Sequence, residues 1–125
     1  MTRKVRAALE GVRIADFCWL WAGAYATGLL AFLGAEVIKI ESTVRADPSR
    51  AMTFTIGQAF EGLEHPPVFN SINLNKLSIN LNLKQPKGID LAKKLIQISD
   101  VVSQNLRPGA MDKIGLGYHT LKELT

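Results

Sequence analysis

The first forty residues show a pattern of apolar and polar positions that is typical of an α/β unit. Apolar residues predict a strand over residues 12–17, and small residues at positions 22–24 allow a sharp turn into a helix over residues 22–33. Gly34 stands where a helix C-cap is expected, and residues 36–40 predict a second strand. When a helix begins just after a strand, the unpaired N–H groups of its first turn lie at the carboxyl end of that strand. Such groups attract anions, so this unit predicts an anion-binding site there.

The second half of the chain repeats the alternation of strand and helix. Strict alternation over residues 77–83 predicts a strand whose leucine and isoleucine side chains share one buried face. A broad apolar face predicts a helix from Pro86 to about Ser99, and residues 100–103 resume strand character. Thr120 and Glu123 fit a capping box, which predicts the start of a last helix.

Residues 43–71 form a long excursion between these halves, with prolines and glycines but no clear period. Loops of that length in compact domains are usually functional or bound by a partner, although a short helix near residues 51–60 would shorten this one. Together the elements describe an α/β fold that is incomplete, and we interpret the chain as part of a larger fold. Residues 1–10 are a basic leader, and residues 11–125 are the folded region.

One stretch of the chain has a second interpretation. Residues 17–35 carry no charged side chain, and about that length is enough to cross a bilayer. However, Asp16 lies directly beside the stretch and Gly23, Gly28 and Gly34 interrupt it, whereas a signal peptide has an unbroken apolar core. We therefore predict a helix within the α/β unit and no association with a membrane.

The composition fits a single domain that binds a small, phosphate-bearing ligand. The length of 125 residues suits one domain, and basic residues exceed acidic residues by 15 − 11 = 4. The basic residues are scattered and do not alternate with aromatic residues, so we expect no nucleic acid partner. The single cysteine, Cys18, lies among apolar residues and is interpreted as a core residue rather than a nucleophile. This usage favours a reducing compartment, and we expect a cytoplasmic protein.

No catalytic or metal-binding arrangement is recognisable from the residue spacing. His65 and His119 have no partner at metal-ligand spacing, so we expect no metal. Asp16 and Glu41 end the first two predicted strands, but nothing in the sequence places the two carboxylates together. We interpret them as structural caps rather than as an acid and base pair.

Five separate blocks of sequence carry a family resemblance. In order along the chain they read GVRIADF, AG, LGAEVIKIE, NLNKLSINLNLK and DVVSQNLRPGAMDKIGLGY. In this order and approximate spacing they resemble the N-terminal segment of the family III CoA transferases, also called the CaiB/BaiF family, over about residues 9–124. The resemblance implies a Rossmann-like parallel sheet with flanking helices that binds coenzyme A. It also implies a larger, interlocked fold, in which the full-length protein is a homodimer or pairs with a related subunit.

By position, the resemblance implies a set of residues that contact CoA. They are Leu20 and Trp21 after the first strand, Ser42 after the second, Leu81, Asn82, Leu83 and Lys84 at the end of the third, and Asn105, Leu106, Arg107 and Lys113 after the fourth. All lie near the carboxyl ends of predicted strands, where open α/β sheets bind ligands. Lys84, Arg107 and Lys113 would supply cations for phosphates. For each lysine taken alone, ordinary surface charge is the favoured interpretation, whereas Arg107 fits both roles. Asn105 would alternatively hydrogen bond its own loop.

The chain departs from the family pattern at four positions. Ala24 stands where the family usually has proline, and Leu77 stands where many members have arginine. Asn82 replaces the usual aspartate, and Ser42 occupies a place where some members direct an arginine at the nucleotide. Together these replacements remove at least two potential charged contacts.

The resemblance also implies a reaction between an acyl-CoA and a carboxylic acid. In the family an aspartate attacks the thioester, forms a mixed anhydride and then an aspartyl-CoA thioester, and CoA passes to the acceptor acid. By resemblance this aspartate lies beyond Thr125, so we predict no catalytic residue in the chain and expect the segment alone to be inactive. Two alternatives stay open: an isomerase of the α-methylacyl-CoA racemase type, and a non-catalytic nucleotide-binding module.

Overall fold

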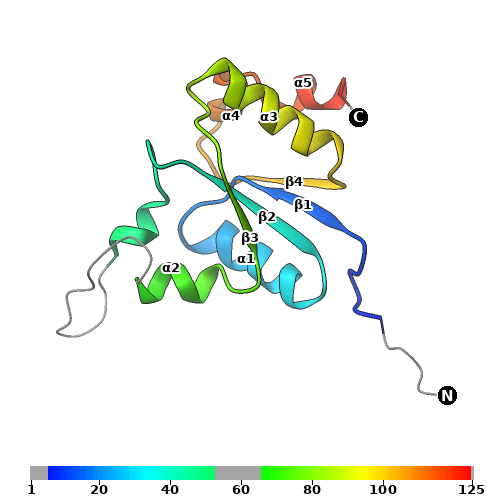
Figure 1. Cartoon of the computed structure of the whole chain (residues 1–125), viewed down its shortest axis with the longest axis vertical. Coiled ribbons are helices and arrows are strands. Elements are labelled where there is room, and N and C mark those ends of the chain that lie inside the picture. The colour runs from blue at the N-terminus through cyan, green and yellow to red at the C-terminus, as the bar shows by residue number, and fades with distance from the viewer. Residues whose placement is uncertain (1–5, 53–65, 125) are drawn as a thin grey trace.

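A parallel sheet organises the structure, a computed structural model that describes residues 6–52 and 66–124. Its strands are β1 (Arg13–Asp16), β2 (Glu36–Glu41), β3 (Leu77–Asn80) and β4 (Val101–Ser103). The strand order is β3-β2-β1-β4, with β1 and β2 in the centre (Figure 1). This arrangement confirms the predicted α/β fold with a parallel sheet.

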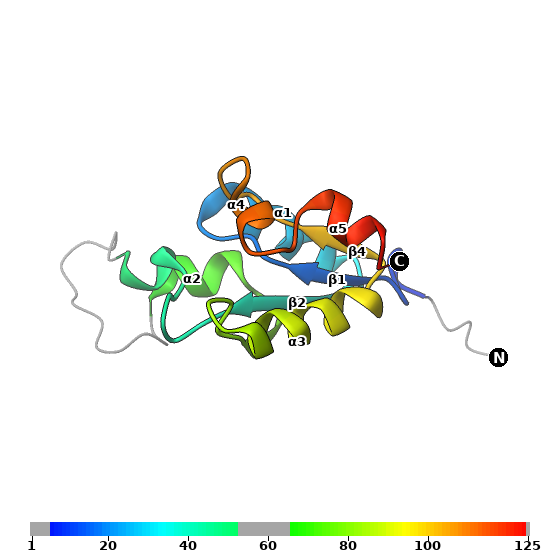
Figure 2. The same cartoon turned by 90° about the horizontal axis from the view of Figure 1, so that it is seen from above.

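Helices cover both faces of the sheet. On one side lie α1 (Trp21–Phe32) and α2 (Pro67–Ile72), and on the other lie α3 (Pro86–Gln97), α4 (Ala110–Lys113) and α5 (Tyr118–Lys122) (Figure 1). Figure 2, which views the molecule from above, shows α3 and α5 side by side in the second layer. A short 3₁₀ helix, η1 (Pro48–Ala51), follows β2.

Alternation along the strands supplies an apolar core on each face of the sheet. Ile14 and Val37 belong to a buried cluster with Ala31 of α1. Ala15 and Ile40, at positions of the same strands that face the other way, belong to a second, larger cluster with residues of α3 and α4. Since both faces of the central strands are buried, the carboxyl ends of β1 and β2 are held in fixed positions.

The segment over residues 17–35 is divided as the sequence predicts. A turn follows β1, and α1 then runs for 12 residues. Gly34 has a φ of 100°, and the N–H groups of Gly34 and Ala35 donate to the carbonyls of Ala31 and Leu30, both at 3.1 Å. This is the glycine-terminated helix end that was expected. Among the residues that the structure describes, no helix is both long and apolar enough to cross a membrane.

The third strand differs from its prediction. Alternation predicts one buried face, but β3 ends at Asn80, and the side chains of Leu77 and Ile79 are 56% and 36% exposed. β3 lies at the edge of the sheet, and only Leu81 and Leu83, beyond its end, pack into the larger buried cluster. Alternation indicates which side chains share a face, whereas their burial depends on whether another element covers that face.

The predicted capping box at Thr120 is wrong. α5 begins at Tyr118 with Gly117 at its N-cap, so Thr120 lies inside the helix. A Cβ at position 117 would lie 2.0 Å from a carboxylate oxygen of Asp112, so a larger residue there would displace the Asp112 side chain. The sequence pattern also misses α2 and α4, which are too short to show a helical period. The helix predicted near residues 51–60 falls largely outside the described residues.

Candidate functional site

A cavity of about 570 Å³ opens at the carboxyl end of the sheet. Its wall comes from the ends of all four strands: Phe17, Trp19 and Leu20 after β1; Ile40, Glu41, Ser42, Val44, Arg45 and Pro48 at the end of β2 and beyond; Leu81, Asn82, Leu83 and Lys84 after β3; and Asn105, Leu106, Arg107, Ala110 and Ile114 after β4. This volume suits a small-molecule ligand. The carboxyl ends of the strands are also where open parallel α/β sheets bind their ligands.

Most of the predicted contact residues meet at this cavity. Leu20, Ser42 and residues 81–84 and 105–107 all line it. Trp21 and Lys113 do not: Trp21 is the first residue of α1 and is 52% exposed, and Lys113 is the exposed last residue of α4. A ligand contact from either of these two residues stays a prediction.

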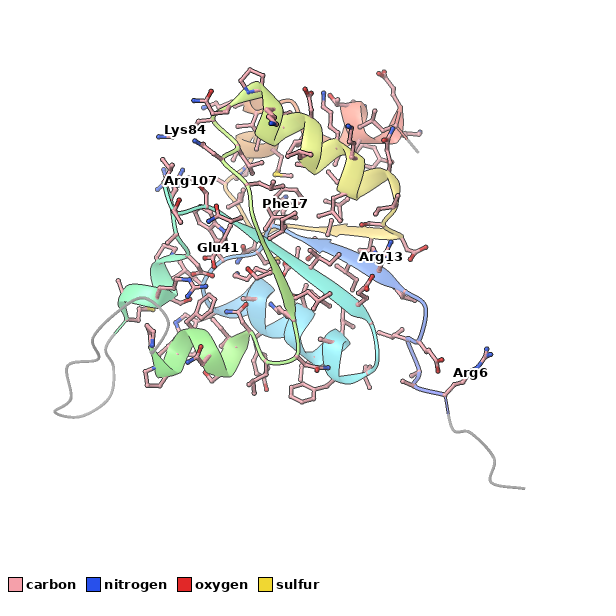
Figure 3. The ribbon with its side chains drawn as sticks, in the orientation of Figure 1. Arg6, Arg13, Phe17, Glu41, Lys84 and Arg107 are labelled. Atoms are coloured by element: carbon pink, nitrogen blue, oxygen red, sulfur yellow. The ribbon has the colours of Figure 1, made fainter. Side chains whose placement is uncertain are left out.

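Positive charge predominates in the cavity wall. The side chains of Arg45, Lys84 and Arg107 are exposed, and no carboxylate pairs with them within residues 6–52 and 66–124. The acidic residue of the wall is Glu41, whose Oε1 accepts a hydrogen bond from Nε of Arg50 at 3.0 Å. Figure 3 shows Lys84 and Arg107 at the same end of the sheet. A ligand with several negative charges therefore suits this wall.

The set of contact residues predicted from the sequence leaves out Trp19 and Arg45, which also line the wall. The guanidinium of Arg45 lies 5.2 Å from the centre of the Trp19 ring, although the residues come from turns after different strands. A basic residue shortly after a strand end is the one signal that could have found Arg45. No pattern along the chain reports its contact with Trp19.

Asn105 joins the turn after β1 to the turn after β4. Its Oδ1 accepts from the N–H of Trp19 at 2.9 Å, and its Nδ2 donates to the Trp19 carbonyl at 2.7 Å. The bond within its own loop, which was the alternative expectation for Asn105, is made by Gln104 instead: Oε1 of Gln104 accepts from the N–H of Leu106 at 2.7 Å. Asn105 thus fixes two sides of the cavity relative to each other.

The loop after β3 is shaped by Asn82 and Gly88. Oδ1 of Asn82 accepts from the N–H of Lys84 at 3.0 Å, which turns the chain just before α3. Gly88 packs directly on this loop, because a Cβ at Gly88 would lie 2.1 Å from the carbonyl oxygen of Asn82. These two residues set the position at which Lys84 joins the cavity wall.

The turn after β1 contains an unusual backbone conformation. Leu20 has φ 58° and ψ −151°, a region that residues other than glycine rarely occupy. Its N–H donates to Oδ1 of Asp47 at 3.2 Å, and Oδ2 of Asp47 accepts from Nζ of Lys39 at 2.8 Å. Lys39 also donates to the carbonyl of Cys18 at 2.8 Å. The buried Lys39 and Asp47 side chains therefore stabilise the strained turn that carries Leu20 into the cavity wall.

Asp16 has the structural role that the sequence predicts. Its Oδ2 accepts from Oγ1 of Thr27 at 2.8 Å and from Nζ of Lys76 at 2.9 Å, and its Oδ1 accepts from the N–H of Cys18 at 3.0 Å. Glu41 is similarly engaged, since it pairs with Arg50. Both carboxylates thus have structural partners, as the sequence interpretation expects.

Burial and hydrogen bonding shift the pKa values of Cys18, Lys76 and Asp47. Burial raises the pKa of the Cys18 thiol to about 12, so this thiol stays protonated, as a core cysteine does. It lowers the pKa of the Lys76 ammonium, and the nearby Asp16 offsets only part of that effect. For Asp47, burial raises the pKa, but hydrogen bonds from Lys39 and Ser49 outweigh burial and hold the pKa below its ordinary value.

The arrangement suits binding better than covalent chemistry. The cavity wall offers exposed cations and apolar side chains, whereas its acidic residue is already paired and the neighbouring thiol is protonated. In the described part of the chain, no group of His, Cys, Asp and Glu side chains could hold a metal ion.

Comparisons with known sequences point to one family. The sequence pattern of CoA-transferase family III matches residues 9–125. The human succinyl-CoA:glutarate CoA-transferase is 42% identical over 116 residues, which are 93% of this chain and 25% of that protein. The formyl-CoA:oxalate CoA-transferase of Streptomyces coelicolor is 38% identical over 117 residues, which are 94% of this chain and 26% of that protein.

Solved structures share the fold. A CaiB/BaiF family protein from Brucella suis matches with a TM-score of 0.82 and 32% identity, over 95% of this chain and 31% of that one. A hypothetical protein from Mycobacterium tuberculosis matches with a TM-score of 0.82 and 31% identity, over 96% of this chain and 31% of that one. The chain thus spans about a quarter of the length of the curated relatives. The resemblance inferred from the five sequence blocks is confirmed.

Proposed function

This chain belongs to CoA-transferase family III, and on that basis we propose that it forms the N-terminal, CoA-binding part of an enzyme that moves CoA from an acyl-CoA thioester to a carboxylic acid. The observation that carries the proposal is the cavity at the ends of four parallel strands, with Lys84 and Arg107 in its wall. CoA has a nucleotide with several phosphate charges and a long neutral arm. The wall offers cations for the phosphates and apolar side chains for the arm.

We infer that this chain binds and orients CoA, and that the covalent step depends on an aspartate beyond residue 125. Glu41 is the acidic residue of the cavity wall, and its carboxylate is engaged by Arg50. Asp16 and Asp47 are buried in ion pairs with lysine side chains. These contacts support a nucleophile from outside the chain, which would form the mixed anhydride and then the aspartyl-CoA thioester.

The names of the relatives suggest the classes of substrate. The human relative is named for succinyl-CoA and glutarate, and the Streptomyces coelicolor relative for formyl-CoA and oxalate. We therefore propose an acyl-CoA donor and a carboxylic acid acceptor for the whole protein, with these two pairs as the first to test. Its homodimeric state and its cytoplasmic location stay predictions.

Binding of CoA to the 125-residue chain tests the proposal. Isothermal titration calorimetry should show saturable binding that weakens as salt is added, because phosphate contacts are screened. Lys84→Ala and Arg107→Ala should each weaken binding about tenfold. The control Lys94→Ala removes an exposed charge of α3 outside the cavity wall and should leave the affinity unchanged. Absence of saturable CoA binding would contradict the proposal.

Incubation with succinyl-CoA and glutarate, or with formyl-CoA and oxalate, tests where the chemistry lies. We expect the chain to produce no new CoA thioester by mass spectrometry, and a longer protein that includes the downstream aspartate to produce one. A thioester made by these 125 residues alone would show that our placement of the nucleophile is wrong. Deuterium exchange at the α-carbon of a 2-methylacyl-CoA by the longer protein, without an acceptor acid, would indicate the racemase type instead.

A further inference from the structure

The turn after β2 brings Arg45 to the cavity. The N–H of Arg45 donates to the carbonyl of Ser42 at 3.1 Å, and the N–H of Val44 donates to Oγ of Ser42 at 3.1 Å. Ser42 and Arg45 also form an isolated antiparallel bridge. These bonds reverse the chain, so the backbone of Arg45 is fixed although its side chain is exposed.

The ring of Trp19 supports the Arg45 side chain. The guanidinium carbon lies 5.2 Å from the ring centre, within the range of a cation–π contact. Trp19 is itself held through its N–H and its carbonyl by Asn105. A cation–π contact does not use the N–H donors of the guanidinium in hydrogen bonds, and the fork of these donors matches a phosphate. Less side-chain freedom is then lost when the anion binds.

The surrounding charges leave Arg45 available to an anion. No carboxylate in the described ranges, 6–52 and 66–124, pairs with it, and the acidic residue of the wall, Glu41, is engaged by Arg50. Lys84 and Arg107 line the same cavity. The three like charges repel one another until an anion is bound, which favours a ligand with more than one negative group.

We propose that Arg45 binds a phosphate group of the nucleotide in this cavity, and that Trp19 is the positioning residue that orients its guanidinium. The proposal rests on the proposed function, because it identifies a further residue of the same CoA site. It adds a cation at the end of β2, where Ser42 offers a neutral hydroxyl that already accepts the N–H of Val44.

Calorimetry on the full 125-residue chain, with CoA and with adenosine 3′,5′-bisphosphate, tests the role of Arg45. Arg45→Ala should weaken CoA binding about tenfold, and Arg45→Lys, which keeps the charge but not the planar fork, about threefold. Arg6→Ala is the matched control: it removes the same charge at the opposite end of the molecule and should leave the affinity unchanged (Figure 3).

Trp19→Leu tests the positioning role. It should weaken CoA binding about threefold in the wild-type chain but have no further effect in the Arg45→Ala background, because the ring acts through Arg45. Trp19→Phe, which retains an aromatic ring, should bind CoA nearly as well as the wild-type chain. If Trp19→Leu lowers the affinity for CoA equally in the wild-type chain and in the Arg45→Ala chain, the positioning role is wrong.

The outcomes separate this proposal from the proposed function. If CoA binds and Arg45→Ala leaves its affinity unchanged, the role of Arg45 is wrong and the proposed function stands. If the chain binds the bisphosphate in an Arg45-dependent manner but does not bind CoA, the phosphate role stands and the proposed function is wrong. If neither ligand binds to the wild-type chain, both proposals are wrong.

Discussion

At the scale of single residues, two buried ion pairs support the turns that line the cavity. Nζ of Lys39 lies 2.8 Å from Asp47, Nζ of Lys76 lies 2.9 Å from Asp16, and these side chains are at most 2% exposed. A buried pair adds little net stability, but removal of one partner leaves an uncompensated charge. Because Asp47 also accepts from the N–H of Leu20, its ion pair connects stability with the shape of the cavity.

Asp47→Asn should lower the free energy of unfolding by about 3–5 kcal/mol, because Lys39 would keep a buried charge without a counter-charge. Urea unfolding followed by circular dichroism measures this change. The matched control is Glu36→Gln, which breaks the exposed pair with Arg13 and should cost less than about 1 kcal/mol. If the two substitutions have equally small effects, the Lys39–Asp47 pair is not the support that we infer.

Acid should weaken the folded state through the same carboxyl group. Burial raises the pKa of Asp47, but the bonds from Lys39 and Ser49 hold it below the ordinary value of about 4. A depressed pKa gives stability that is present above the unfolded pKa and is lost as the pH falls through the folded pKa. The free energy of unfolding, measured in urea at a series of pH values, should therefore fall below about pH 4. In Asp47→Asn the decline should be shallower, and an identical decline would contradict this assignment.

At the scale of elements, the sequence predicts a helix or strand best where a periodic apolar pattern ends at a residue that stops the element, such as glycine. α1 is an example, because its apolar run stops at Gly34, whose positive φ ends the helix. The exposure of Leu77 could not be predicted, since it depends on the edge position of β3 and not on the pattern within β3. α4 was missed because four residues show no period.

The candidate site, too, could be predicted only in part, because the sequence pattern does not report contacts between distant segments. The family resemblance placed residues such as Lys84 and Arg107 at strand ends, and the fold brings these ends together. Contacts that join turns far apart in the sequence escaped prediction. Asp47 with Leu20 and Arg45 with Trp19 are such contacts, because neither residue of a pair carries information about the other.

Gly88→Ala should destabilise the contact between α3 and the loop after β3. The added Cβ would lie 2.1 Å from the carbonyl oxygen of Asn82, so the loop must move, at a cost of about 1–3 kcal/mol in the free energy of unfolding. Since Lys84 belongs to that loop, calorimetry should also show weaker CoA binding. Lys87→Ala, at an exposed position in the same turn of α3, is the control and should change neither quantity.

We expect the edge strand β3 to pair with other copies of the chain, and Leu77→Lys to reduce this self-association without loss of the fold. Leu77 lies on the edge strand with more than half of its side chain exposed, and charged residues on edge strands prevent pairing with other chains. Light scattering over a concentration series measures the association. Leu81→Lys is the contrasting variant, because Leu81 is buried in the larger cluster and a charge there should unfold the chain. Unchanged scattering of Leu77→Lys would exclude the β3 edge as the site of association.

At the scale of the whole molecule, one surface of the chain is apolar. Along the outer side of α1 lie the exposed side chains of Trp21, Tyr25, Leu29, Phe32 and Leu33. The spacing of four residues places the first three on one side of the helix. Exposed apolar surfaces of this kind mark contacts with other parts of a protein. We therefore expect another protein surface to cover this side of α1.

The hydrogen bonds between Asn105 and Trp19 have a consequence for the lifetime of the protein. They connect residues 86 positions apart, so the cavity exists only when the first and the last strand are in place. A ligand that binds in the cavity therefore stabilises the folded state. At a concentration a hundredfold above its dissociation constant, it raises the free energy of unfolding by about 2.7 kcal/mol. Proteases cut chains that have opened, and the supply of nucleotide should accordingly set how quickly this polypeptide is degraded.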